Sequence, residues 1–253
     1  MPKDNKEQEA IQNWKILKQA IDCIHTKTGT PLGFGELLQT AHNLIKAKAE
    51  QMFYDECRKV THEHMRPIRE RLLHTDDKDL LAAMAEDWGF CMDAFIKVKD
   101  FFIPLKKYIT RMKLKPIYDL QVEVFKNEVF LVGDMNHKVI STMVKQVEKE
   151  RNGENMDRVA MTNMVMLIDQ IDDPNAKGLY ESKFEGPFLV DTKKFYVKLS
   201  LQLLTENSAP DYITKIHHMY LDEQDRADSY LRPSTKEKLM NTYLDECITK
   251  HAT

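Results

Sequence analysis

Residues 179–196 read "LYESKFEGPFLVDTKKFY", a stretch in which aromatic side chains stand among charged ones. Because an α-helix has about 3.6 residues per turn, apolar residues spaced four and seven apart lie on one helical face. Large apolar side chains on one face are usually buried against neighbouring helices. The stretch therefore predicts helices that pack against each other through the aromatic residues Tyr180, Phe184, Phe188, Phe195 and Tyr196.

Helical spacing of apolar residues continues through the rest of the chain. Residues 14–21 and 135–147 both carry apolar side chains three and four positions apart, and the strict alternation typical of strands is absent. Only 8 glycines and 9 prolines interrupt 253 residues. We expect about ten helices joined by short loops. The predicted fold class is all-α, an elongated, solenoid-like rod of stacked helices.

Two short patterns predict where helices begin. Ser208 is followed three residues later by Asp211, and Ser234 is followed by Glu237 at the same interval. A serine hydroxyl at an N-cap, with a carboxylate three residues on, is the pattern of a capping box. The sequence therefore predicts that Ser208 and Ser234 are N-caps.

Composition narrows the possible partners and compartments. The formal net charge of −3 and the pI near 6.3 argue against nucleic acid as a partner, because phosphate binding needs a basic surface. We expect no membrane span and no signal peptide, because apolar runs are short and the start, "MPKDNKEQEA", is charged. The scattered cysteines favour reduced, buried thiols, and we expect a cytoplasmic and nuclear protein.

Candidates for catalysis or metal binding are weak. His62 and His64 are two positions apart, and His217 and His218 are adjacent, so neither pair points to one side of a helix. The glycines of "GTPLGFG" match no phosphate-binding loop, and methionines at helical spacing in residues 156–171 favour core packing. We predict no catalytic residue, no metal, no cofactor and no small-molecule substrate.

Several motifs together resemble the N-terminal region of the cullin family. They are "NWKILKQAI" at 13–21, "VKQVEKERNGENMDRVAMTNMVMLI" at 144–168, "FEGPFL" with a following "FY" at 184–196, and "LTENSAPDYITKIHHMYLDEQDRADSYLRPSTKEKL" at 204–239. The resemblance covers nearly the whole chain, and "ENSAPDYI" looks most like cullin-3 members. It implies stacked five-helix cullin repeats, with a polar tail at 1–10, a first, adaptor-docking repeat at 11–150 and a second repeat at 151–253 that need not be complete.

The resemblance also implies a function as a non-catalytic scaffold, the adaptor-binding part of a cullin-RING ubiquitin ligase. Cullin-3 members take BTB-domain proteins as substrate adaptors, so a BTB-domain protein is the expected partner. A RING protein is a partner only if a further C-terminal region exists. The alternative is a divergent helical-repeat protein that binds or sequesters another partner without ubiquitin ligase function.

The expected adaptor-binding residues also follow from the resemblance, because cullins dock adaptors on the second and fifth helices of the first repeat. The sequence departs from the family here: Leu38 and His42 stand where two tyrosines are expected, and Pro104 stands at a third tyrosine position. Such changes at an interface can weaken or redirect binding, because a few aromatic anchors carry most of its energy. The expected contact set is Leu32, Phe34, Leu38, His42 and Tyr108.

Overall fold

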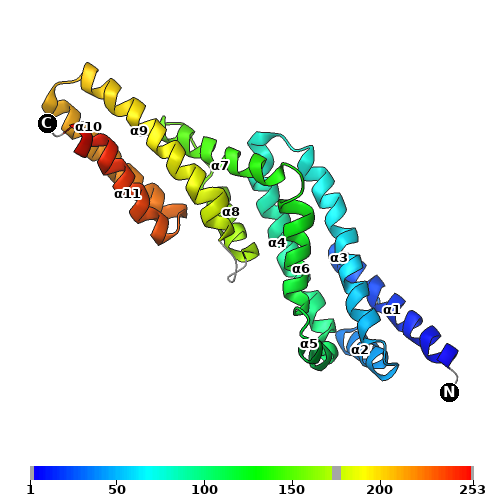
Figure 1. Ribbon diagram of the computed structural model, residues 1–253. Coiled ribbons are helices and arrows are strands. Elements are labelled where there is room, and N and C mark those ends of the chain that lie inside the picture. Colours follow the sequence, from blue (N-terminus) through cyan, green and yellow to red (C-terminus); the bar gives the residue numbers. More distant parts are fainter. Residues whose placement is uncertain (1–2, 173–177, 252–253) are drawn as a thin grey trace. The chain divides into compact units, whose positions relative to one another are not determined.

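The structure, a computed structural model, describes residues 3–172 and 178–251 (Figure 1). Every regular element in these two ranges is a helix, which confirms the all-α prediction. The chain forms two compact units, and it passes from one to the other just before α4, within α4 and at the start of α7. The first unit comprises residues up to 75 and residues 86–135, and the second comprises residues 76–85 and 136–253.

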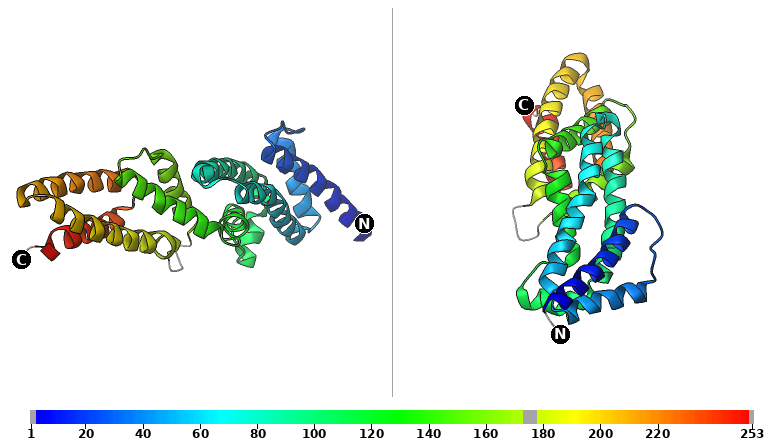
Figure 2. Two further views of the ribbon diagram at one scale, coloured as in Figure 1. Left: turned by 90° about the horizontal axis from the view of Figure 1, so that it is seen from above. Right: turned by 90° about the vertical axis from the view of Figure 1, so that its right-hand side faces the viewer.

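The helices of the first unit pack around one apolar core. Trp14, Leu17 and Ile21 bury one face of the first helix in this core, as the periodicity predicts. Figure 2 shows the first two helices packed against each other, in dark and medium blue. The elements are α1 (Lys3–His25), α2 (Phe34–Lys46), α3 (Glu50–Leu73), α4 (Asp77–Phe101), η1 (Ile103–Leu105), α5 (Lys106–Met112), α6 (Ile117–Phe125) and η2 (Lys126–Phe130).

Helix α1 begins at Lys3, within the residues 1–10 for which the sequence predicts a polar tail, and Ala10 is buried in the core. A helix whose later turns are held by packing extends readily into residues of good helical propensity such as Lys, Glu and Gln. The boundaries of the two cullin repeats, and the elongated stacking of the chain, stay predictions.

The second unit contains the aromatic stretch. Its elements after α4 are α7 (Met135–Arg151), α8 (Arg158–Ile171), η3 (Tyr180–Glu185), α9 (Gly186–Glu206), α10 (Ala209–Tyr230), α11 (Pro233–Cys247) and η4 (Thr249–His251). Tyr180 and Phe184 lie in η3, a π-helical turn, and Phe188 follows in α9. All three are at most 1% exposed, so the predicted packing role is confirmed.

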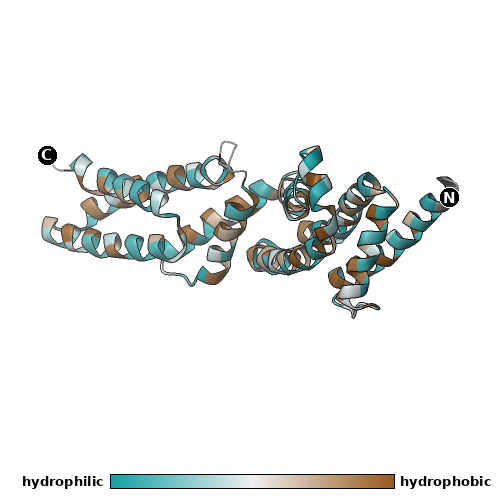
Figure 3. Ribbon diagram, turned by 90° about the horizontal axis from the view of Figure 1, so that it is seen from below, coloured by the Kyte–Doolittle hydropathy of each residue, from teal (hydrophilic) through white to brown (hydrophobic). Residues whose placement is uncertain are grey.

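The aromatic residues join α9 and its preceding turn to α11. The Tyr180 hydroxyl lies 2.9 Å from the Thr235 hydroxyl on α11, and the Arg232 guanidinium stacks 3.9 Å from the Tyr180 ring centroid. On α9, Tyr196 makes an edge contact with Tyr243 of α11 at 4.6 Å between ring centroids. Figure 3 colours the residues by hydropathy, and hydrophobic and hydrophilic residues alternate along the helices.

One of the two predicted N-caps is correct. Ser208 caps α10, and its hydroxyl accepts a hydrogen bond from the Asp211 backbone N–H at 3.4 Å. The Ser234 prediction is wrong, because α11 begins at Pro233, with Arg232 as its N-cap, two residues earlier than predicted. Proline is favoured at the first helical position because its missing N–H would have no partner there.

Candidate functional site: an exposed face of helix α2

The start of α2 is fixed by backbone capping and by core packing. Gly33 is the N-cap, and its N–H donates to the Glu36 carboxylate at 2.9 Å. Leu32, just before the cap, packs against the same core cluster that contains Leu37. This arrangement of apolar residues around a cap is a hydrophobic staple, which fixes the angle at which the chain enters the helix. Phe34 is thereby held at the first helical position.

Three of the predicted contact residues share one stripe of α2. Phe34, Leu38 and His42 are spaced four residues apart, and each step turns about 40° around the helix axis. The neighbouring face of the helix buries its side chains in the core, at Leu37, Thr40, Ala41 and Leu44. Phe34 and His42 are exposed and Leu38 is half-buried, so the stripe is open to solvent.

Phe34 combines exposure with a defined position. Its side chain is 51% exposed, which is unusual for a phenylalanine. Its ring lies 6.2 Å from the ring of Phe101, at the end of α4. Helix α2 also packs against η1, where Ile103 is 55% exposed. Sequence reasoning missed Ile103, although "DFFIPL" signals an apolar run next to a helix-breaking proline.

The other two predicted residues have packing roles. Leu32 is half-buried in the staple, and Tyr108 on α5 packs against the core of the first unit. The Tyr108 hydroxyl donates to Gln51 on α3 at 2.5 Å, and Arg111 lies 5.5 Å from its ring. The structure therefore unites Phe34, Leu38 and His42 on α2, and it places Tyr108 on a different element, partly engaged with α3.

A buried ionic cluster, which sequence reasoning also missed, lies in the second unit. Arg151 on α7 donates from Nε and Nη2 to Glu223 on α10, at 2.9 and 3.2 Å. Arg226 donates to the same carboxylate at 2.7 Å, and the Tyr196 hydroxyl donates to it at 2.5 Å. Burial alone would raise the pKa of Glu223, but the two arginines and these hydrogen bonds hold it below its ordinary value. Arg151 and Glu223 are at most 1% exposed, so the cluster is inaccessible to a substrate.

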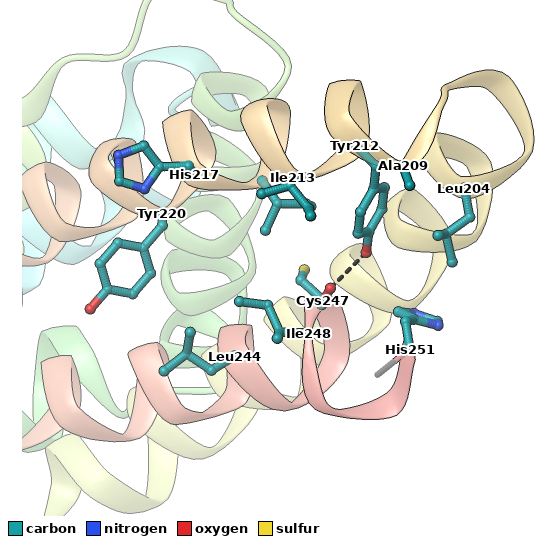
Figure 4. Close-up of a pocket in the computed structure, with 11 residues that line it drawn as sticks. Leu204, Ala209, Tyr212, Ile213, His217, Tyr220, Leu244, Cys247, Ile248 and His251 are labelled. Carbon is teal, nitrogen blue, oxygen red and sulfur yellow. Dashed lines mark hydrogen bonds between the residues drawn. The ribbon is translucent and has the colours of Figure 1, made fainter. Parts of the chain in front are cut away.

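An apolar pocket of about 620 Å³ lies between the end of α9, α10 and α11 (Figure 4). Ile213, Leu244 and Ile248 line it, and the Tyr212 hydroxyl donates to the Cys247 carbonyl at 2.6 Å.

Burial raises the pKa of two cysteine thiols, Cys247 beside this pocket and Cys57 in the first unit, to about 12. These thiols stay protonated near neutral pH, which makes them poor nucleophiles.

His62 and His64 each contact a different carboxylate, whereas the rings of His217 and His218 lie 6.2 Å apart. His64 Nε2 lies 2.8 Å from Asp22, and His62 Nδ1 lies 3.2 Å from Glu128. Among the residues that the structure describes, no three His, Cys, Asp or Glu side chains gather as they would around a metal ion. In the same part of the chain, each helix is too short or too polar to cross a bilayer.

Comparisons with known proteins agree with the resemblance seen in the motifs. The family model described as "Cullin alpha solenoid domain" matches residues 14–253. Cullin-3 of Dictyostelium discoideum is 27% identical over 242 residues, which are 95% of this chain and 31% of that protein. Cullin-3 of Caenorhabditis elegans is 24% identical over 249 residues, covering 97% of this chain and 32% of the relative.

A plant relative is equally similar. Cullin-3B of Arabidopsis thaliana is 24% identical over 243 residues, which are 96% of this chain and 33% of that protein. The chain spans about a third of the length of the curated relatives it matches. With a solenoid domain that matches from Trp14 to Thr253, the chain belongs to the cullin family.

Proposed function

We propose that this chain is the adaptor-binding part of a cullin scaffold for a ubiquitin ligase. In this function the chain makes and breaks no bond. It holds a substrate adaptor in a fixed position, and so raises the effective concentration of the substrate near the enzyme that transfers ubiquitin. Membership of the cullin family supports the scaffold function. Such a scaffold is expected in the cytoplasm and the nucleus, which imaging of a tagged chain can test.

The observation that carries the adaptor-binding proposal is the exposure of Phe34. An aromatic ring 51% exposed on a capped helix start is positioned to enter a pocket on a partner. Leu38 and His42 continue the same stripe, and Ile103 adds an exposed apolar side chain on an element that packs against α2. We expect the adaptor to contact Phe34, Leu38 and His42, together with Leu32 and Tyr108, and we add Ile103 to this set.

We further propose that the adaptor is a BTB-domain protein. Curated relatives that cover nearly all of this chain are cullin-3 proteins from three distant organisms. The resemblance to cullin-3 members in "ENSAPDYI" points the same way. We expect a RING protein to join the assembly only if the protein has a further region. The curated relatives are about three times as long as this chain.

A second candidate function follows from the identity of two docking residues. Leu38 and His42 replace tyrosines that the family resemblance leads us to expect, and a changed surface is what a changed partner requires. In this alternative the chain keeps the cullin fold and binds or sequesters a different protein without ligase function.

Calorimetric titration of the purified chain with three adaptor classes distinguishes the adaptor-binding proposal from the divergent-partner alternative. We expect a BTB-domain adaptor to bind more tightly than a Skp1-type or an elongin-type adaptor. The proposal fails if a Skp1-type adaptor binds best, since that outcome points to another cullin class. If all three adaptors fail to bind a correctly folded chain, the divergent-partner alternative is supported instead.

A further inference from the structure

A long groove runs between α7 and α9 of the second unit, outside the adaptor-docking face. It consists of two cavities of about 590 and 300 Å³. Both cavities are lined by Glu148, Asp191 and Lys194, so they form one continuous depression. Along η3 and α9 it extends from Lys183 to Gln202, about 28 Å at 1.5 Å per helical residue.

The walls of the groove are held in place from beneath. Arg151, near the end of α7, donates to the Thr192 hydroxyl on α9 at 2.9 Å, and its guanidinium lies 5.3 Å from the Phe195 ring. Its side chain is 1% exposed, because the ion pair with Glu223 anchors it on the far side. The groove is therefore preformed, which lowers the entropic cost of binding a partner.

The floor of the groove is apolar. Ile140 and Val144 contribute from α7, and Pro187 and Val190 contribute from α9. Val190 is 55% exposed, so it offers an apolar surface that no other part of the described chain covers. The apolar residues on the α9 side run from Pro187 to Leu199, about 18 Å at 1.5 Å per residue, which matches about three turns of a bound helix.

The rims of the groove are basic. Lys145 on the α7 side and Lys183, Lys194 and Lys198 on the other side are exposed, and within the described residues none of the four has a carboxylate within 4.0 Å. The lining carboxylates are Glu148 and Asp191, which gives a formal charge of +4 − 2 = +2. The whole chain has a formal net charge of −3, so the groove is opposite in sign to the protein that carries it.

We propose that this groove docks an acidic amphipathic helix of another protein. The apolar stripe of that helix would lie on Val144 and Val190, and carboxylates on its two flanks would pair with Lys145 on one rim and Lys194 on the other. A basic or polar residue near its middle would face Glu148 and Asp191. Complementary charges on both rims fix the orientation and register of the helix and speed its association.

The two carboxylates in the groove disfavour a nucleic acid or a lipid headgroup layer as the occupant. A nucleic-acid backbone carries a negative charge at every phosphate, and it would meet Glu148 and Asp191 halfway along the groove. A helix can place a residue of either sign at that point. The apolar floor also matches side chains at helical spacing rather than a sugar-phosphate chain.

A designed peptide provides the probe. It is a 20-residue helix with a leucine stripe, glutamates on both flanks and one central lysine, labelled for fluorescence anisotropy. A second peptide has glutamate and lysine exchanged throughout. We expect the acidic peptide to bind the chain at least tenfold more tightly than its charge-exchanged counterpart, and we expect the difference to shrink as salt rises.

Two double variants locate the binding. Lys145→Glu with Lys194→Glu reverses both rims, whereas Lys149→Glu with Lys215→Glu makes the same change of net charge at exposed lysines outside the groove. The rim variant should bind at least tenfold more weakly, and the control should stay within about twofold of the parent. Val190→Asp, at an exposed site, disrupts the floor and should also weaken binding without lowering the melting temperature.

Three outcomes overturn the proposal. The first is equal affinity for the two peptides, and the second is equal weakening by the rim and control variants. The third is a chain that does not bind the acidic peptide but binds phosphatidylserine vesicles or a single-stranded oligonucleotide, when the rim variant loses that binding. Circular dichroism melting of each variant shows that a loss of binding is not a loss of fold.

Discussion

Arg151 and Glu223, 72 residues apart in the sequence, form an ion pair that water does not reach. Their side chains are 1% and 0% exposed, and 2.9 Å separates Arg151 Nε from Glu223 Oε1. Because the pair joins α7 to α10, and Arg151 also reaches Thr192 on α9, these two residues tie together three helices of the second unit. The arrangement stabilises the fold only while both charges are present.

Replacing Arg151 with methionine should therefore be severe. The change leaves the Glu223 carboxylate buried beside a single arginine, and breaking a buried pair typically costs about 3–5 kcal/mol. Arg158→Met is the matched control, because Arg158 pairs with Glu150 and Asp225 but is 39% exposed, and it should cost about 1 kcal/mol or less. Urea unfolding of both variants measures the difference. Equal losses of unfolding free energy in the two variants would show that the buried ion pair contributes no more to stability than the exposed one.

The aromatic stretch at residues 179–196 supports a second prediction about stability. Phe188 is 1% exposed, and its ring stacks on Phe184 at 5.6 Å between centroids. Phe188→Ala should lower the free energy of unfolding by about 3–5 kcal/mol, because it leaves a cavity in the core. Val190→Ala, two residues on and 55% exposed, should change it by less than about 0.5 kcal/mol. A small effect at Phe188 would contradict its assignment to the core.

Much of the fold could be predicted because it depends on local patterns. The spacing of Tyr180, Phe184 and Phe188 marks a buried face, and a buried face is what the structure has there. Ser208 caps a helix as its neighbours indicate, whereas Ser234 does not, because Pro233 is the better first residue. Local signals compete, and the sequence alone does not give their relative strength.

Features that join distant residues could not be predicted in this way. Nothing near Arg151 marks Glu223 as its partner, and the rims of the basic groove come from helices about 40 residues apart. The resemblance to cullins proposed Phe34, Leu38 and His42 as contacts, and the structure places them on one stripe of α2; that they bind an adaptor stays a prediction. Leu32 and Tyr108 were harder to place, because both are partly buried against the core of the first unit.

His25 gives the chain a pH dependence near neutrality. Its ring, at the end of α1, stacks on that of His64 at 4.2 Å, and neither of its nitrogens has a hydrogen-bond partner among the described residues. Burial, followed by the nearby His64, lowers the pKa of His25 to about 3, although Asp22 opposes the shift. The unfolded chain binds a proton near pH 6.5, whereas the folded chain does not.

Stability from His25 is therefore fully present above about pH 6.5 and declines as the pH falls toward 3. The loss should amount to about 2 kcal/mol at pH 5, at about 1.4 kcal/mol per pH unit. His25→Leu should reduce this loss, because leucine fills the site and carries no titrating group. Urea unfolding at pH 7, 6 and 5 tests this, and an unchanged slope in the variant would place the titration elsewhere. Other charged groups around the cavity at His25, which the variant leaves in place, are Lys27, His64, Arg71, Glu86 and Asp87.

The solenoid architecture of the family predicts an elongated particle. A compact globule of 253 residues has a radius of gyration of about 18 Å. We expect small-angle scattering to give a clearly larger value and an asymmetric distance distribution, with a circular dichroism spectrum dominated by helix. A radius close to that of a globule in a monomeric sample would contradict the stacked arrangement.

The central claim is that the exposed face of α2 binds an adaptor through Phe34, and one comparison tests it most directly. Calorimetry with a BTB-domain adaptor, together with the melting temperature, is measured for Phe34→Ala and Phe188→Ala. Truncating an interface anchor costs on the order of 2 kcal/mol, or about thirtyfold in affinity, with little effect on the fold. The account predicts that Phe34→Ala weakens binding by about this factor and melts near the parent temperature, whereas Phe188→Ala melts early. A Phe34→Ala chain that binds the adaptor as tightly as the parent would contradict it.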